Sequence, residues 1–302
     1  MVIDQLVEAI LQKRNPCIVG IDPEWPKLPL CYRELEISKA EAVLTWAKDV
    51  IDAVQDIVPA VKPQMAFFEV FGWEGLQVHQ QVVAYAHKKG LLVIDDSKRN
   101  DIGNTAAAYA FAHLAKDGPI NADFLPVNPF LGSDSIAPFV ETAQQHGKGL
   151  FVLVKTSNPS SGELSDAITT SGESVCEWLA GLVKSNGSGL TGRYGYSAIG
   201  AVVGATHPDE AKKLRSLMKE QFFLVPGYGA QGGCAADITG CFHPDGLGAV
   251  VSSSRGILYH YLQSGAEPAD RRAYQADVRR QALLMRSDVC EALSSAYGQL
   301  AY

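Results

Sequence analysis

Short apolar runs recur along the chain, and each is followed by a polar turn and then by a segment with helical spacing. Such runs, bounded by turn residues, are typical of buried strands. The pattern predicts strands at residues 16–21, 60–62, 91–95, 124–127, 150–154, 199–203, 222–225 and 249–252. It predicts helices between them at residues 40–57, 73–89, 105–116, 135–146, 175–184 and 207–219.

This alternation of strands and helices indicates the fold class. Ser38 and Glu41 have the spacing of a capping box, which supports the start of the first of these helices. Strands that alternate with helices form a parallel sheet, and the number of strands favours closure into a (β/α)8 TIM barrel. We therefore expect a single barrel domain over residues 1–302, with a C-terminal helical extension from about residue 268 that packs outside the barrel.

Two segments do not fit the short turns of a regular barrel. Residues 156–174 are rich in Ser, Thr, Gly and Pro, without obvious internal structure, and form a longer connection than an ordinary turn. Loops of this kind often act as lids over a site. Residues 185–195 precede the sixth strand on the opposite face, and they are either structural or disordered.

Composition excludes several classes of function. The chain is 47% hydrophobic and carries a formal charge of −7, with no long basic run, so we expect no nucleic-acid partner. It has no apolar stretch of membrane-spanning length and no signal peptide at its start, so we expect no membrane association. The 6 cysteines are scattered without metal-binding spacing. Buried thiols of this kind fit a reducing, cytoplasmic location.

A charged cluster directly follows the third predicted strand. Asp96, Lys98 and Asp101 have the spacing Asp-x-Lys-x-x-Asp at the end of the apolar run 91–94. Ligands bind at the carboxyl ends of the strands in a barrel, and alternating charges there can hold a lysine protonated beside an anionic substrate. This arrangement suits carbanion chemistry with Lys98 as the proton donor. The alternative is a solvated loop in which Asp and Lys simply pair.

Glycine-rich and basic residues follow the last two strands. Pro226 begins a segment with four glycines in residues 227–233, where backbone N–H groups can approach an anion and Gln231 adds a neutral donor. After the eighth strand, Arg255 follows a run of serines. The loops after strands seven and eight form the usual phosphate site of these barrels. A purely structural turn is the alternative for the glycine-rich segment.

These motifs closely resemble those of the orotidine 5′-phosphate decarboxylase family. The charged cluster matches the signature Asp-x-Lys-x-x-Asp-Ile-x-x-Thr, and the later loops match Pro-Gly-x-Gly-x-Gln-Gly-Gly and Ser-Arg-Gly-Ile. The resemblance extends from Asp22 to about Tyr259. Residues 203–208 and the long loop after the fifth strand are most similar to the longer bacterial, type 2 subgroup.

The resemblance implies conversion of orotidine 5′-monophosphate into UMP and CO₂ in pyrimidine biosynthesis, with no metal or organic cofactor. It implies that Lys98 protonates C6 of the pyrimidine, that Asp96 faces the departing carboxylate, and that Asp101 keeps Lys98 charged. Ribose contacts and support of the charge network fall to Asp22 and Lys62, the pyrimidine contact to Ser157, and the phosphate contacts to Gln231 and Arg255. Further substrate-binding positions are Ile102, Thr105, Pro226 and Gly232.

The resemblance also implies a homodimer with shared active sites. Asp101 and Thr105 would reach across the twofold interface, while Asp96 and Lys98 would serve the site of their own subunit.

Three rival functions remain for the charged cluster. A related sugar-phosphate decarboxylase or synthase with Mg²⁺ needs an acidic metal ligand at the end of the second strand, where this chain has Lys62. A Schiff-base aldolase needs a neutral lysine, which Asp96 and Asp101 disfavour. A non-catalytic phosphate-binding barrel would have little use for the cluster.

Overall fold

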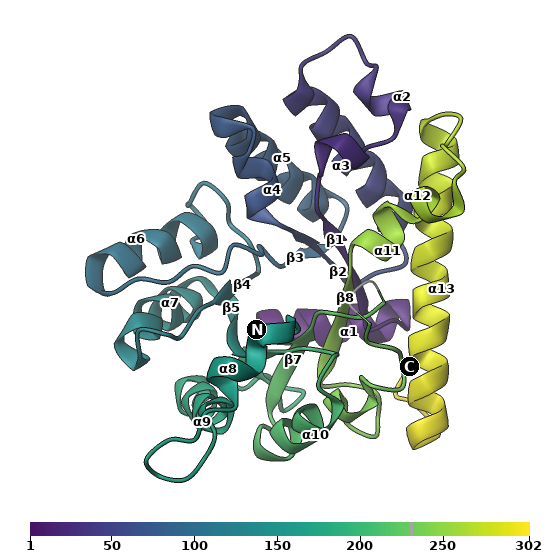
Figure 1. Ribbon diagram of the computed structural model, residues 1–302. Coiled ribbons are helices and arrows are strands. Elements are labelled where there is room, and N and C mark those ends of the chain that lie inside the picture. The colour runs from purple at the N-terminus through teal and green to yellow at the C-terminus, as the bar shows by residue number, and fades with distance from the viewer. Residues whose placement is uncertain (230–231) are drawn as a thin grey trace.

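The computed structural model describes residues 1–229 and 232–302, and it confirms the predicted (β/α)8 barrel. Its strands form one parallel sheet in the order β3-β2-β1-β8-β7-β6-β5-β4, drawn in Figure 1. A parallel bridge between Ile94 and Phe124 joins the two outer strands, β3 and β4, and so closes the sheet. The strands are β1 (Cys17–Ile21), β2 (Ala60–Pro63), β3 (Leu92–Val93), β4 (Phe124–Val127), β5 (Gly149–Lys155), β6 (Ser197–Val203), β7 (Gln221–Val225) and β8 (Ala249–Ser253).

The third strand is shorter than the predicted 91–95. Beyond Val93 the backbone N–H groups donate in turn to β2 and to β4, instead of pairing regularly with one strand. Ile94 N donates to Val61 O at 3.0 Å, and Asp95 N donates to Phe124 O at 2.9 Å. The chain therefore stays extended up to the charged cluster, although the regular strand β3 contains only Leu92 and Val93. This alternation sends the side chains of Asp95 and Asp96 to opposite sides of the barrel wall.

The predicted helices lie outside the sheet, with ends that differ by a few residues. Ser38 Oγ accepts a hydrogen bond from Glu41 N at 3.2 Å, and Ser38 N donates to Glu41 Oε2 at 3.0 Å, which confirms the capping box. The six helices are α3 (Lys39–Val54), α5 (Gly72–Lys88), α6 (Gly103–Leu114), α7 (Ser133–His146), α9 (Val175–Gly187) and α10 (Pro208–Leu217).

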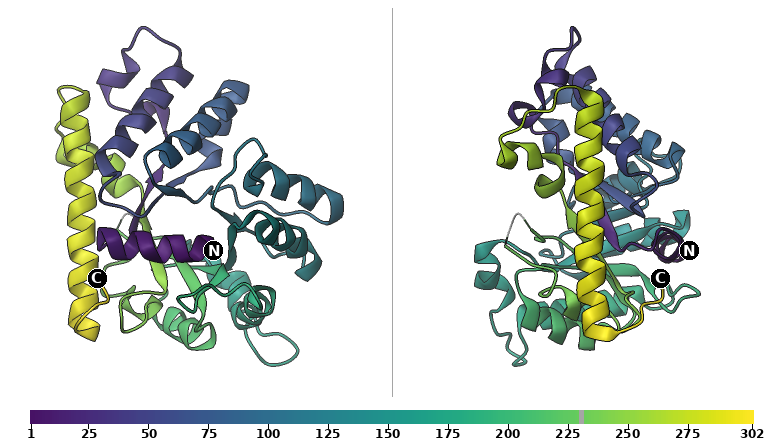
Figure 2. Two further views of the ribbon diagram at one scale, coloured as in Figure 1. Left: turned by 180° about the vertical axis from the view of Figure 1, so that it is seen from behind. Right: turned by 90° about the vertical axis from the view of Figure 1, so that its right-hand side faces the viewer.

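An N-terminal helix that the pattern analysis did not predict covers one end of the barrel. Figure 2 shows α1 (Val2–Lys13) running across that end when the molecule is seen from behind. Its buried face includes Leu6, Val7 and Ile10. The segment at residues 185–195 is structural: α9 continues to Gly187, and Arg193 then forms an ion pair with Glu8 of α1 at 2.5 Å.

The C-terminal tail forms one long helix, α13 (Arg271–Tyr297), on the outside of the barrel, as Figures 1 and 2 show. Trp46 Nε1 of α3 donates to Tyr274 Oη at 2.8 Å, and Arg271 forms an ion pair with Asp49 at 2.6 Å. Among the residues described, no helix is long and apolar enough to cross a membrane.

The long connection after β5 has more internal structure than its composition indicated. It contains the short helices η2 (Pro159–Ser161) and α8 (Gly162–Ser165). Buried Lys155 ties them to the barrel, because its ammonium bonds Asp166 at 2.5 Å and Ser165 Oγ at 2.8 Å. The remaining short helices are η1 (Trp25–Lys27), α2 (Leu30–Arg33), α4 (Met65–Glu69), η3 (Thr239–Cys241), α11 (Arg255–Leu258) and α12 (His260–Ser264).

Candidate active site

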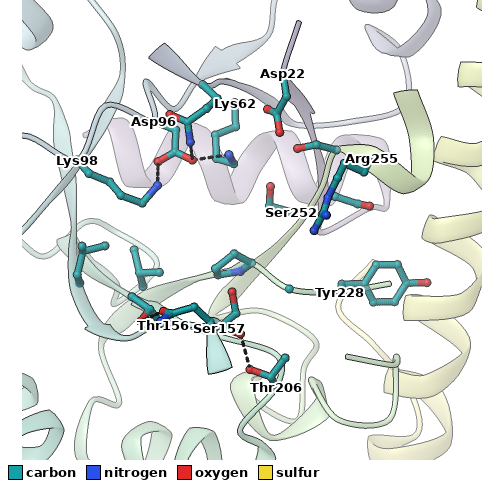
Figure 3. Close-up of a pocket in the computed structure, with 18 of the residues that line it drawn as sticks. Asp22, Lys62, Asp96, Lys98, Thr156, Ser157, Thr206, Tyr228, Ser252 and Arg255 are labelled. Carbon is teal, nitrogen blue, oxygen red and sulfur yellow. Dashed lines mark hydrogen bonds and ion pairs between the residues drawn. The ribbon is translucent and has the colours of Figure 1, made fainter. Parts of the chain in front are cut away.

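A cavity of about 900 Å³ opens at the carboxyl ends of the strands. Figure 3 shows side chains from both sides of the barrel pointing into it. Barrel enzymes place their chemistry at this end of the strands. The lining residues are Asp22, Lys62, Gln64, Asp96, Lys98, Leu153, Thr156, Ser157, Asn158, Pro159, Val202, Thr206, His207, Pro226, Gly227, Tyr228, Ser252, Ser253, Ser254 and Arg255.

Asp96 lies between two lysines in this cavity. Its Oδ2 is 2.5 Å from Lys62 Nζ and its Oδ1 is 2.5 Å from Lys98 Nζ. Gln64 Nε2 donates a further hydrogen bond to Oδ2 at 3.0 Å. Both carboxylate oxygens therefore have cationic partners, as Figure 3 shows, and Asp96 and Lys62 are buried rather than solvated.

Burial and charge oppose each other within this cluster. Burial alone would raise the pKa of Asp96, but the ammonium groups of Lys62 and Lys98 outweigh it and hold that pKa below its usual value. Burial alone would lower the pKa of Lys62, yet the carboxylates of Asp96 and Asp22 raise it. The pair is therefore ionised at neutral pH, which preorganises charge for a reaction.

Lys98 has an unusual backbone conformation at the centre of the charged segment. Its φ angle is +47°, in the left-handed region that disfavours residues with a Cβ by about 1–2 kcal/mol. Its side chain is 44% exposed, whereas that of Asp96 is 8% exposed. The ammonium group of Lys98 is consequently the part of the cluster that a ligand in the cavity can reach.

Asp22, at the end of β1, contributes the second carboxylate of the cavity. Burial raises the pKa of its carboxyl group above the usual value, and the opposing effect of Lys62 is smaller. Its Oδ1 atom is buried and has no hydrogen-bond partner among the described residues. A buried acceptor without a partner is unfavourable, so this atom can take a hydroxyl group from a ligand.

Ser157 lies on the opposite wall, at the start of the long connection after β5. Thr206 Oγ1, after β6, donates to the Ser157 carbonyl at 3.2 Å. The backbone of Gly204 approaches so closely that a Cβ there would lie 2.8 Å from both N and Cα of Ser157. The position of Ser157 therefore depends on a residue far along the chain.

The residues expected to bind phosphate are only partly described. Pro226 and Arg255 line the cavity, and Figure 3 shows the Arg255 side chain beside Ser252. Gly232 is exposed and does not line it, and its φ of +98° suits glycine. Gln231 lies outside the described residues.

Three residues of the charged motif do not line this cavity. Asp101 accepts a hydrogen bond from Ile102 N at 2.8 Å, and the side chains of Ile102 and Thr105 are exposed. They lie on the turn into α6 and its first residues. The loop after β4 does not line the cavity either, and Asn128 Oδ1 accepts from Phe130 N at 3.0 Å, which is turn geometry.

Several lining residues were not predicted from the sequence. The sequence signal for Gln64 was its place two residues after Lys62, at the end of β2. Ser254 was a neighbour of Arg255 in the serine run. Thr206 and His207 lie in the segment 203–208 and Tyr228 lies in the glycine-rich segment, but none was assigned to the site, because only the approach of separate strands brings them to the cavity.

A parallel barrel with a paired Lys–Asp–Lys cluster in a cavity at its strand ends defines a (β/α)8-barrel enzyme. The model of the orotidine 5′-phosphate decarboxylase / HUMPS family matches residues 16–261. The chain belongs to this family.

Individual relatives agree over nearly the full length. The orotidine 5′-phosphate decarboxylase of Rhodopirellula baltica is 41% identical over 295 residues, covering 94% of this chain and 97% of the relative. That of Clostridium tetani is 37% identical, covering 98% and 100%. A provisionally assigned orotidine 5′-phosphate decarboxylase from Streptomyces avermitilis, solved by crystallography, is 38% identical with a TM-score of 0.78, covering 95% of each chain. These relatives confirm the resemblance on which the sequence analysis relied.

Proposed function

We propose that this family member decarboxylates orotidine 5′-monophosphate to UMP and CO₂ directly, with Lys98 as the proton donor. The substrate carboxylate leaves as CO₂, its bonding electron pair remains on C6, and a proton from Lys98 Nζ forms the new C6–H bond. The neutral lysine then regains a proton from solvent. The observation that carries this proposal is the Lys62–Asp96–Lys98 cluster, with both contacts at 2.5 Å.

The cluster supports this chemistry through its charges. The carbanion at C6 has no conjugated electron sink, so a fixed ammonium group must stabilise it. Lys98 provides that charge at the cavity surface and is a general acid within reach. Asp96 lies beside it, where its negative charge would oppose the substrate carboxylate and favour the loss of CO₂.

The other lining residues fit the remaining parts of the nucleotide. The unpartnered Oδ1 of Asp22, with Lys62 behind it, suits a ribose hydroxyl. Ser157 on the opposite wall suits the pyrimidine edge, and Arg255 suits the phosphate, because guanidinium groups bind phosphate through charge-assisted hydrogen bonds. We assign Pro226, Gly232 and Gln231 to the same phosphate loop.

The rival functions fit the cluster less well. The end of β2 carries Lys62, whose ammonium group pairs with Asp96 where a metal-dependent relative needs an acidic ligand. Among the described residues, no group of three or more His, Cys, Asp or Glu side chains could hold a metal ion. A Schiff-base mechanism needs Lys98 as a neutral amine, but this lysine pairs with an ionised carboxylate.

Incubation with orotidine 5′-monophosphate in the presence of EDTA tests the function. We expect the ultraviolet absorbance of the substrate to change to that of UMP at the same rate with and without EDTA. Treatment with borohydride during turnover should trap no covalent adduct on Lys98. A rate that EDTA abolishes would favour the metal-dependent relative, a trapped adduct the aldolase, and no turnover the non-catalytic barrel.

We further propose that the protein is a homodimer in which Asp101, Ile102 and Thr105 serve the site of the neighbouring subunit. These residues do not line their own cavity, and Asp101 is half-buried while Ile102 and Thr105 are exposed, so such a contact is open to them. Large apolar side chains are exposed on the adjoining elements, which suits a protein interface. They are Val70 (73% exposed), Trp73 (68%), Ile102 (53%) and Phe130 (71%).

Arg99 connects the elements that carry these apolar side chains. Its guanidinium group bonds Glu69 Oε1, next to Val70, at 3.0 Å. Its carbonyl accepts from Asn128 N, near Phe130, at 3.0 Å. The exposed apolar residues therefore belong to one side of the barrel, where α4, α5, α6 and α7 lie in Figure 1.

Subunit exchange between two inactive variants tests the shared site. In a mixed dimer of Lys98→Ala and Asp101→Ala, one site collects both defects and the other collects none. Random pairing makes half of the dimers mixed, so about a quarter of all sites should regain activity. A mixture that stays inactive despite proven exchange would contradict the shared site.

The cytoplasmic location, the lack of a nucleic-acid partner and the subgroup stay predictions.

A further inference from the structure

A buried cluster of one carboxylate and two imidazoles lies behind the charged motif. Asp95, which precedes Asp96, is fully buried. Its Oδ2 bonds His113 Nδ1 of α6 at 2.5 Å, and its Oδ1 is 3.1 Å from His79 Nε2 of α5. Because neighbouring residues of an extended chain point to opposite sides, Asp95 faces the helices while Asp96 faces the cavity. The mechanism proposed above uses none of these three side chains.

The second nitrogen of His113 also has a partner. Arg99 Nε donates to His113 Nε2 at 3.1 Å. An arginine can only donate, so Nε2 must carry a lone pair and Nδ1 must carry the proton. Burial alone would raise the pKa of Asp95, but its contacts with the imidazoles outweigh burial and hold that pKa well below its usual range. The ionised Asp95 is therefore an acceptor, which suits a proton on His113 Nδ1.

The imidazole ring of His113 thus contacts the chain both before and after Asp96 and Lys98. Its Nδ1 binds residue 95 and its Nε2 binds residue 99, and Asp96 and Lys98 lie between them. Lys98 has the unfavourable φ of +47°. Backbone in that region persists only where the surroundings fix it, and contacts on both sides of the segment do so.

We propose that His113, held by Asp95, is a positioning residue that fixes the segment between Asp95 and Arg99 and so sets the place of the Lys98 ammonium group. This rests on the proposed role of Lys98 as proton donor. Arg99 extends the same set of contacts to α4, because it bonds Glu69 at 3.0 Å, and Gln64 just before α4 bonds Asp96. The helix α6 that carries His113 also begins beside Ile102, at the proposed interface.

The decisive variant is His113→Asn. An asparagine amide can keep the hydrogen bond to Asp95, so the buried carboxylate retains a partner, but it does not reach Arg99. Misplacement of a reacting group by about 1 Å can lower a rate about 10²-fold. We expect kcat to fall by roughly that factor, while the KM for orotidine 5′-monophosphate and the Kd for UMP change less than about threefold.

A double-variant cycle with Arg99→Met sharpens the test. If His113 acts through Arg99, each single variant lowers kcat to a similar degree and the double variant loses little more. His87→Gln is the matched control, because His87 also pairs with an aspartate, Asp123, at 2.8 Å, but at the other end of the barrel wall. We expect it to retain the kcat of the unmodified protein.

Other outcomes overturn the proposal. A His113→Asn variant with unchanged kcat shows that the contact with Arg99 is dispensable. If kcat falls only because the dimer dissociates, His113 acts in assembly. If kcat and the affinity for UMP fall equally, His113 acts in general stability. A separate result tests the proposed role of Lys98: turnover by the Lys98→Ala variant would show that Lys98 is not the proton donor. A crystal structure of His113→Asn gives a readout without activity: we expect Lys98 Nζ to leave Asp96, and an unmoved Lys98 contradicts the proposal.

Discussion

The wall of the cavity built from β1, β2 and β3 carries the charged residues Asp22, Lys62, Asp96 and Lys98. The wall from β5, β6 and β7 carries the uncharged residues Thr156, Ser157 and Thr206. Figure 3 shows the two groups facing each other across the cavity. On the first wall, side chains bond one another at 2.5 Å. On the second wall, loops hold neutral donors in place through backbone contacts.

This difference indicates a division of tasks. A charge cluster that is already paired needs little reorganisation during a reaction, which favours catalysis. Neutral hydroxyl and backbone groups discriminate between ligands by hydrogen bonding, because a mismatched ligand leaves them unpaired. We therefore expect changes on the charged wall to lower kcat, and changes on the neutral wall or at the phosphate end to raise KM.

Lys98→Ala should give the largest effect. Removal of the ammonium group deletes both the proton donor and the charge that stabilises the carbanion, so we expect kcat to fall by about 10⁴-fold or more. The side chain is 44% exposed, so the chain should remain folded and still bind UMP. Turnover can be followed by absorbance and UMP binding by calorimetry. Near-normal turnover of this variant would show that the charged wall is not the one that carries out catalysis.

Asp96→Asn should reduce stability in addition to lowering kcat. It leaves Lys62 without its closest counter-charge, and breaking a buried pair lowers the free energy of unfolding by about 3–5 kcal/mol. Because the pKa of Asp96 is lowered in the folded state, its contribution is complete above the unfolded value of about 4 and is lost as pH falls toward the folded value. Urea unfolding from pH 7 to pH 3 should show the difference from the unmodified protein shrinking below about pH 4. A difference that does not change with pH would argue against this ion pair.

Arg255→Ala should affect binding rather than chemistry. Loss of a charge-assisted contact to phosphate should raise the KM for orotidine 5′-monophosphate by roughly 10²-fold. The same variant should matter far less with orotidine, which lacks the phosphate. Steady-state kinetics with both substrates measure this contrast, and equal losses would place Arg255 in a structural role.

The two walls also differ in how far the sequence predicts them. Asp96 and Lys98 follow one apolar run, and Lys62 follows another, so their place at the strand ends was evident from local pattern. Their mutual contacts follow from the barrel, since adjacent parallel strands bring their carboxyl ends together. The eight strands were predicted for the same reason, apart from the early end of β3.

The neutral wall was harder to predict because its geometry depends on contacts between distant segments. Ser157 was expected from the family resemblance, but Thr206 and His207 were not, since the resemblance of residues 203–208 gave them no role in the site. The structure of the connection after β5 depends on Lys155, whose buried ammonium group bonds Asp166. Likewise, α1 precedes the first strand and so lies outside the alternation of strands and helices from which the other helices were predicted.

Gly204→Ala should produce the smallest effect and the most specific one. A Cβ at this position would lie 2.8 Å from the backbone of Ser157, which must shift because real Cβ contacts are almost never that short. A displaced hydrogen bond to the pyrimidine should raise KM about tenfold, the loss of one such bond. Because the charged wall is untouched, kcat should stay within about twofold. Gly181→Ala is the matched control, since a Cβ there meets nothing within 4 Å. A fall in kcat with unchanged KM would show that the neutral wall, too, takes part in the chemical step.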